Sequence, residues 1–189
     1  YAGAKSHLTG AGWLGFRSVS VTGPDGLTST TITAQNEPYI GLPLSHTVTR
    51  PGGYLVSTTA TTYGSYTYND AANASRSYRP YTVNTSQSTY ELNGALIGTT
   101  TTVNDPPDSY GNLLKSTVTT SDGLSKTTLS TYLNDPLNAR YGLVTSLTVT
   151  ATWNGASHTR RSYFDYALPS GWLQKEVIEP ATYTPQTVG

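Results

Sequence analysis

The chain has 189 residues, its 11 lysines and arginines balance its 11 aspartates and glutamates, and 12% of its residues are charged. Nucleic-acid binders draw much of their affinity from basic side chains on the phosphates, so this neutral composition excludes that class. The absence of cysteine excludes a thiolate metal centre and a disulfide framework. Since no apolar run reaches the length of a spanning helix, we expect no membrane span.

The remaining composition predicts an ordered all-β protein. Threonine and serine are abundant, tyrosine reaches 15 residues against 2 phenylalanines, and 11% of the chain is aromatic. Threonine and tyrosine suit a pleated, half-buried surface and have low helix preference. A disordered chain would not hold so many aromatic side chains.

Turn signals divide the chain into hairpins. They are four Asx-Gly pairs: Asp25-Gly26, Asn93-Gly94, Asp122-Gly123 and Asn154-Gly155. This dipeptide is the one that best accepts positive φ at both central positions of a tight hairpin. Each pair lies between two strand-like runs, so we expect antiparallel hairpins over residues 18–33, 85–102, 113–132 and 143–166.

Alternation of side chains supports these strands. An apolar set alternates with threonines 148, 150 and 152, and consists of Leu147, Val149, Ala151 and Trp153. This pattern predicts a strand with an apolar face and a hydroxyl face. On that assignment, Trp153→Ala would destabilise the sheet by ~3–5 kcal/mol. Residues 69–76 lack the pattern and are open to either a short helix or a turn.

Similar hairpins follow one another, which predicts an internal repeat. One unit runs from Tyr110-Gly111 through Asp122-Gly123 to Tyr132, and the next from Tyr141-Gly142 through Asn154-Gly155 to Tyr163 and Tyr166. A further copy begins at Gly15-Phe16. A period of about 30 residues is typical of repeat proteins, whose units cannot bury their own apolar face and stack on their neighbours.

Several motifs resemble the RHS/YD-repeat region of insecticidal toxin-complex B components and related bacterial virulence proteins. The stretch from Tyr1 to Phe16, with Gly3-Ala4, His7, Gly10, Gly12 and Gly15, is similar to the start of that region, and Gln35, Pro38-Tyr39 and Gly41 to the motif that follows. Residues 108–113 (Asp-Ser-Tyr-Gly-Asn-Leu) resemble the core of a YD repeat. Residues 163–166 (Tyr-Phe-Asp-Tyr) and 171–173 (Gly-Trp-Leu) resemble its closing element. Residues 73–80 fit no repeat.

The resemblance implies an all-β fold of antiparallel hairpin repeats that form an extended, curved sheet, one segment of an RHS/YD β-shell. Residues 1–50 would lead into the RHS region, residues 51–180 would be YD-like hairpin repeats, and residues 181–189 a loose C-terminal tail. We expect an excised piece of a larger secreted or bacterial cell-surface protein, with a structural, non-catalytic role and no cofactor. Its partners would be neighbouring repeats of the parent and an encapsulated toxic polypeptide. Exposed strand edges would let the isolated fragment self-associate.

No pattern places a catalytic or metal site. We expect His7 to be a hydrogen-bonded structural histidine packed against Trp13, and His46 and His158 to lie at the surface. No Gly-x-Ser-x-Gly elbow is present for a serine nucleophile. The sequence around these histidines and serines therefore predicts no acid–base pair.

The acidic residues give no stronger signal. Glu176 and Glu179 are expected on a solvated strand face rather than as a glycosidase pair. Asn104, Asp105 and Asp108 lack the regular ladder of a calcium loop. The family has a self-cleaving core, and residues 135–141 (Asp-Pro-Leu-Asn-Ala-Arg-Tyr) are superficially similar to one of its motifs. Because no partner motif is present, we expect no self-cleavage.

One aromatic and basic cluster is the candidate binding surface. It consists of Tyr63, Tyr66, Tyr68, Arg76, Tyr78, Arg79 and Tyr81. Aromatic rings flanked by arginines can stack on sugars or bind a partner surface. Such rings can equally be structural, covering the sheet with their hydroxyls in water. A cell-surface glycan-binding or adhesive β-module, with glycans as its ligands, is therefore the alternative function.

Overall fold

The computed structural model describes the chain except residues 9, 11, 71–74, 169 and 180–189, and it describes residues 68–70, 75 and 76 by their backbone alone. The chain divides into two compact units, Tyr1–Thr102 and Val103–Gly189. Positions 50 and 51, the predicted border between the leading segment and the repeats, lie in a turn within the first unit. The predicted tail, 181–189, lies outside the described residues.

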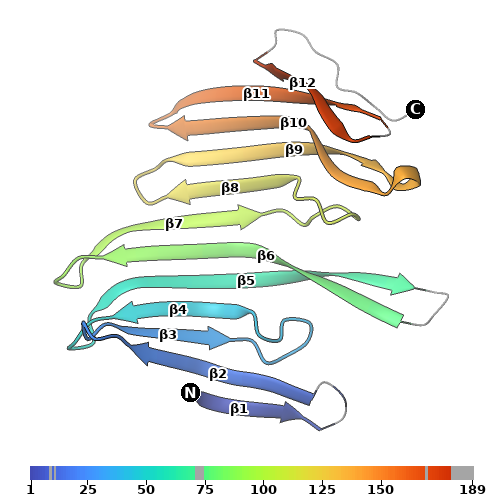
Figure 1. The fold of residues 1–189 in the computed structure, drawn as a ribbon. Coiled ribbons are helices and arrows are strands. Elements are labelled where there is room, and N and C mark those ends of the chain that lie inside the picture. The colour runs from blue at the N-terminus through green and yellow to red at the C-terminus, as the bar shows by residue number, and fades with distance from the viewer. Residues whose placement is uncertain (9, 11, 71–74, 169, 180–189) are drawn as a thin grey trace. The chain divides into compact units, whose positions relative to one another are not determined.

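The described part of the first unit consists of antiparallel strands that pair in chain order (Figure 1). They are β1 (Ala2–His7), β2 (Gly12–Thr22), β3 (Thr28–Thr33), β4 (Pro43–Thr49), β5 (Leu55–Asp70), β6 (Ser75–Tyr90) and β7 (Leu96–Asn104), which ends just past the unit border. The predicted hairpins at 18–33 and 85–102 are formed by β2–β3 and β6–β7. The hairpins β4–β5 and β5–β6 carried no recognised turn signal.

The second unit has the same organisation. Its strands are β8 (Lys115–Thr120), β9 (Ser125–Asp135), β10 (Arg140–Trp153), β11 (Ala156–Ala167) and β12 (Trp172–Ile178), with one turn of 3-10 helix, η1 (Pro136–Asn138), between β9 and β10. Each strand pairs antiparallel with the next along the chain. The hairpins predicted at 113–132 and 143–166 are β8–β9 and β10–β11.

The all-β prediction is therefore confirmed, and the described residues contain no α-helix. The helical alternative for residues 69–76 is wrong where it can be seen, because β5 continues to Asp70 and β6 begins at Ser75. Residues 71–74 lie outside the described part. Alternating hydroxyls and rings along both strands favour the pleated ladder over a helix.

Most of the Asx-Gly turns have a different geometry from the predicted one. In the β2–β3 turn, the Gly23 N–H donates to the Leu27 carbonyl (2.8 Å), the Gly26 N–H donates to the Gly23 carbonyl (3.0 Å), and positive φ falls on Gly26 alone. The Asp25 carboxylate accepts from the Leu27 N–H at 3.1 Å. This is a three-residue loop closed by a left-handed glycine, in which the Asx side chain replaces a backbone acceptor.

The same geometry recurs at Asn93-Gly94 and Asp122-Gly123. Only Asn154-Gly155 has the predicted positive φ at both residues, 49° and 78°, and it joins β10 to β11 through two residues. The prediction of turns at these four places is confirmed. The prediction of their type holds for one of them, because local hydrogen bonds hold the other Asx residues at negative φ.

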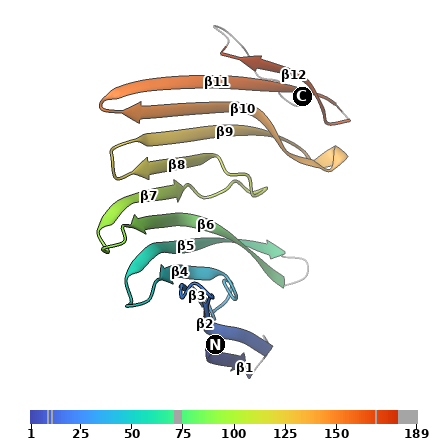
Figure 2. The same ribbon diagram turned by 60° about the vertical axis from the view of Figure 1, so that its left-hand side comes forward.

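In each unit the described strands form a single layer, as the two views in Figures 1 and 2 show. The buried residues among those described are few: Leu14, Ala34, Leu133, Asp135 and Thr145. Ala34 begins the 34–42 connection and Leu14 lies beside it, while Leu133 and Asp135 end β9 and Thr145 lies in the adjacent part of β10. Since the described residues form no second layer, each side chain packs chiefly on its neighbours in adjacent strands.

The predicted division of β10 into an apolar face and a hydroxyl face is confirmed, but the apolar face is not buried as the predicted cost of Trp153→Ala requires. Leu147, Val149 and Ala151 do share one face, but they are half-buried, like the threonines on the other face. Trp153 is 57% exposed. Alternation shows which residues share a face, but it does not show whether anything covers that face.

We expect Trp153→Ala to cost about 1 kcal/mol of unfolding free energy, the scale of a cross-strand contact, rather than the ~3–5 kcal/mol of a packed core ring. Leu133→Ala, at a site 7% exposed, should cost about 2–5 kcal/mol. Urea denaturation followed by circular dichroism measures both. A larger loss for Trp153→Ala than for Leu133→Ala would contradict the single-layer packing.

Candidate functional site

The register of β5 and β6 separates the predicted aromatic and basic cluster onto two faces. Tyr66 pairs with Arg79 and Gly64 with Tyr81, so Tyr66, Arg79 and Tyr81 share one face. Tyr63 pairs with Thr82 and Tyr78 with Thr67, which places both tyrosines on the opposite face. The backbones of Tyr68 and Arg76 belong to the same ladder, but their side chains lie outside the described residues.

Tyr81 has an identifiable structural role. A Cβ atom placed on Gly64 would lie 2.6 Å from the Cζ and hydroxyl oxygen of Tyr81, so the ring rests directly on the glycine across the strand pair. Glycine in a strand lacks a side chain to pack, and a ring from the adjacent strand supplies that contact. Tyr66 and Tyr78, by contrast, are 37% and 44% exposed.

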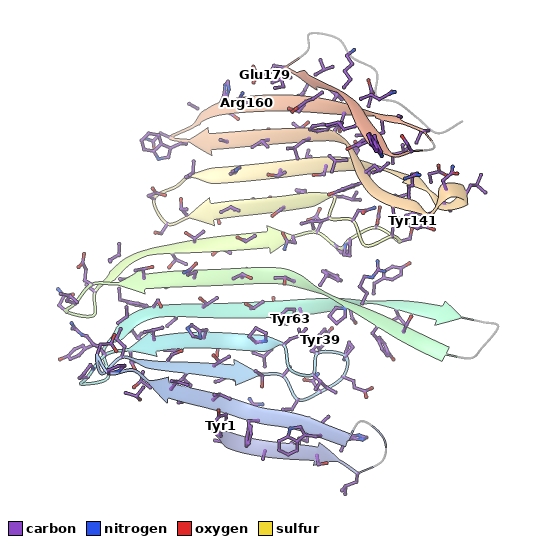
Figure 3. The ribbon with its side chains drawn as sticks, in the orientation of Figure 1. Tyr1, Tyr39, Tyr63, Tyr141, Arg160 and Glu179 are labelled. Atoms are coloured by element: carbon purple, nitrogen blue, oxygen red, sulfur yellow. The ribbon has the colours of Figure 1, made fainter. Side chains whose placement is uncertain are left out.

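Tyr63 also has a structural role, on the opposite face. Its hydroxyl donates to the Pro43 carbonyl at 2.9 Å, and its ring stacks on Tyr39 with 6.2 Å between centroids (Figure 3). Burial raises the pKa of Tyr63, and the hydrogen bond with Thr61 lowers it by less. The net effect is a raised pKa. Tyr63 therefore fastens the 34–42 connection to β5 and is not a free platform for a ligand.

Two further tyrosines make the same contact as Tyr63. The Tyr132 hydroxyl donates to the Leu113 carbonyl at 3.0 Å, and the Tyr166 hydroxyl donates to the Val144 carbonyl at 2.8 Å. Each of the three tyrosines lies on the second strand of a hairpin. Its hydroxyl bonds a carbonyl of the first strand, or of the residues just before it, toward the end remote from the turn. We call Tyr63, Tyr132 and Tyr166 the clasp tyrosines. In β3, Thr33 makes a comparable bond to the Phe16 carbonyl at 2.7 Å.

Hydroxyl side chains form continuous rows across the strands, which we call the hydroxyl rows. In the first unit the row is Ser20, Thr30, Thr47, Thr58 and Ser88 by register, extended to Thr99 by a 2.8 Å hydrogen bond between Ser88 and Thr99. In the second unit it is Thr117, Thr127, Thr150 and Thr159. Some neighbouring hydroxyls bond each other, as in Ser20–Thr30 at 2.8 Å and Thr150–Thr159 at 2.9 Å. These rows line one face of each unit with short polar side chains.

The motif that resembles a YD-repeat core builds a loop rather than a reactive site. The Asp108 carboxylate accepts from the N–H groups of Tyr110 (2.9 Å) and Asn112 (2.8 Å) and from the Asn112 amide (2.9 Å). Burial alone would raise the pKa of Asp108, but these hydrogen bonds outweigh it and the pKa is lowered. Asn134 joins this loop to the next connection, because its Oδ1 accepts from Asn112 and from the Gly142 N–H.

A cavity of about 270 Å³ lies between β1, β2 and the 34–42 connection. Its lining residues are Lys5, His7, Leu14, Gln35, Asn36, Glu37 and Ile40. The Gln35 amide holds its wall together, because Nε2 donates to the carbonyls of Gly3 (2.6 Å) and Gly15 (2.9 Å). Positive φ at Gly15 (81°) turns β2 at this point. The residues come from the two N-terminal motifs that the sequence singled out, but the sequence did not show that they meet.

The three histidines differ in their surroundings. His7 lines this cavity, and its imidazole makes no hydrogen bond to any described residue, so the expected structural bond is not found. His46 is half-buried, with Nδ1 3.0 Å from the Thr31 hydroxyl, rather than at the open surface as expected. His158 is exposed, as predicted.

The acidic candidates also bond locally. Asp135 is 4% exposed and caps η1, because its carboxylate accepts from the N–H of Asn138 and, at 2.6 Å, from its amide. Glu179 pairs with Arg160 at 3.0 Å (Figure 3). The described residues hold no cluster of acids and histidines that could bind a metal ion. No helix formed by the described residues is long and apolar enough to cross a membrane.

The chain matches no family model, no curated protein and no solved structure.

Removing one clasp hydroxyl should destabilise the fold measurably. We expect Tyr166→Phe to cost ~0.5–1.5 kcal/mol, since the ring stays and the hydrogen bond to Val144 is lost. Tyr141→Phe is the matched control, because Tyr141 stacks on Tyr110 (5.4 Å) and its hydroxyl bonds no described residue. Equal denaturation midpoints for the two variants would contradict the clasp.

The clasps also predict loss of stability in alkali. Burial raises the pKa of Tyr166 above its ordinary 10.0, and the pKa of Tyr63 is raised likewise. The contribution of these two tyrosines to the free energy of unfolding is therefore fully present below pH 10.0. It falls as the pH rises, because the unfolded chain loses these protons first. Urea midpoints above and below that pH measure the effect. The urea midpoint of the double variant Tyr63→Phe, Tyr166→Phe should fall less steeply with pH than that of the unmodified 189-residue chain. An unchanged slope would refute the role of these tyrosines in the alkaline loss of stability.

Proposed function

We propose that the chain is a structural, non-catalytic wall segment of a larger, secreted RHS/YD-type shell that encloses a toxic polypeptide. The observation that carries the proposal is the single layer of strands in each unit, with no second layer over either face among the described residues. A free-standing globular domain buries one face of its sheet against a second layer. A wall separates two spaces and needs only one layer.

The hydroxyl rows support this role. An enclosing surface must border an unfolded chain without gripping it, and large apolar patches would bind such a chain tightly. The hydroxyl rows instead present short polar side chains, and several neighbouring pairs among them are hydrogen-bonded to each other. We assign the face with the hydroxyl rows to the enclosed side.

The clasp tyrosines support a repeat architecture. They recur with similar spacing, bonding carbonyls that lie 20, 19 and 22 residues earlier in the chain. A hairpin closed at one end by a tight turn and at the other by a clasp is a self-contained unit that can be added to a sheet many times. Self-association through exposed edges such as β1, whose residues are all exposed, remains our expectation for the isolated chain.

Glycan binding stays the alternative because Tyr66 and Arg79 face one another across β5 and β6 on a partly exposed surface. A glycan array distinguishes it. Binding that is lost in Tyr66→Ala and kept in Tyr78→Ala, on the other face, would favour the adhesive module. A wall should give no specific signal.

The lack of cysteine in this chain allows a direct test of the wall. Thr58→Cys and Thr59→Cys place thiols at adjacent residues of β5 on opposite faces, and both sites are half-buried. In the intact parent protein, with its own cysteines replaced, a thiol reagent too large to enter the shell should label Thr59→Cys and spare Thr58→Cys. In the isolated 189-residue chain both should label.

The outcome decides the proposal. Equal labelling of the two thiols in the intact parent would mean that neither face is enclosed, and the wall role would be refuted. Protection of Thr59→Cys instead would retain a wall but reverse the assignment of its faces. A small, freely diffusing thiol reagent is the control that both cysteines are reactive.

A further inference from the structure

The cavity between β1, β2 and the 34–42 connection contributes nothing to the proposed wall. It is a concave site on an otherwise thin sheet, and its polar lining comes from two separate segments. Lys5 and His7 come from alternate positions of β1, and Glu37 comes from the connection that folds over it.

Opposite charges line this cavity without pairing. No ion pair or hydrogen bond joins the side chains of Lys5, His7 and Glu37 in the described part of the chain. Elsewhere the described residues do pair, as in Lys115–Asp105 (3.7 Å) and Arg160–Glu179 (3.0 Å). A molecule that carries both a carboxylate and an ammonium group can pair with each charge across the cavity, which a singly charged molecule cannot do.

The cavity also has an apolar part. Leu14, which is 4% exposed, and the half-buried Ile40 lie among its lining residues. Pockets for small ligands typically combine an apolar surface with a few polar groups that fix orientation, and begin at roughly 300 Å³. At about 270 Å³, this cavity suits a ligand of few atoms with a short aliphatic chain. The Gln35 bonds to Gly3 and Gly15 hold the walls in place before a ligand arrives.

We propose that this cavity binds a small aliphatic zwitterion, an α-amino acid of the leucine type. Its carboxylate pairs with Lys5 and His7, its ammonium group pairs with Glu37, and its side chain covers Leu14 and Ile40. The proposal does not rest on the wall function, because it concerns residues near one end of the chain that take no part in the hydroxyl rows or in the clasps.

The test is a titration of the ¹⁵N-labelled 189-residue chain with L-leucine, followed by amide chemical shifts. Two analogues each lack one charge: 4-methylpentanoate lacks the ammonium group, and isoamylamine lacks the carboxylate. We expect leucine to shift the amides of β1 and of residues 35–40, and each analogue to bind about tenfold more weakly, since each forfeits one charge-assisted contact.

Variants test the two poles separately. Lys5→Gln and Glu37→Gln should each weaken leucine binding about tenfold. The matched controls Lys126→Gln and Glu91→Gln, at exposed sites outside the cavity, should leave it unchanged. A high salt concentration should also weaken leucine binding to the unmodified 189-residue chain.

Three results would overturn the proposal. They are no shift with leucine at about 10 mM, equal binding of leucine and either analogue, or unchanged binding in Glu37→Gln. Even if a variant fails to fold, the two analogues test the proposal on the unmodified 189-residue chain. A negative result here leaves the cysteine-labelling test of the wall unaffected, and the reverse also holds.

Discussion

The constraint on which the structure depends is that each unit has a single layer of strands. Because the described residues form no second layer, a strand is held chiefly by its neighbours in the sheet, so cross-strand register decides the partners of its side chains. The hydroxyl rows, the contact of Tyr81 with Gly64 and the three clasps all follow from that register. Two of the few buried side chains, Leu14 and Ala34, lie at the 34–42 connection.

The sequence predicts the features that are local. An Asx-Gly pair marks its own turn, and alternation over a few residues marks its own strand, so the fold class and four hairpins could be inferred. The β4–β5 hairpin was missed because its Pro51-Gly52-Gly53 turn lacks an Asx residue. The turn type was misjudged at Asp25 because the competing side-chain hydrogen bond to Leu27 cannot be seen in a dipeptide. Whether other residues cover Trp153 depends on segments that are distant in sequence, which local patterning does not encode.

The candidate sites show the same limit. Closeness in sequence suggested one tyrosine and arginine cluster, but adjacent residues in a strand face opposite ways, and a register shift after Thr62 sets the pairing beyond it. The cavity was missed for the converse reason, because Lys5 and Glu37 are distant in sequence and meet only through the fold. A usable signal was Gln35, a long amide beside the glycine-rich motifs, where backbone carbonyls of bent strands need a donor.

The turns and connections between the strands bear on evolution and design. The loop closed by Gly26 has a fixed hydrogen-bond pattern, which an inserted residue would disturb. The 34–42 connection is longer but is fixed as well, because the Gly41 N–H donates to the Ala34 carbonyl and Tyr39 stacks on Tyr63. New sequence should therefore replace a whole turn rather than lengthen one. A foreign peptide or epitope grafted in this way would leave the paired strands intact.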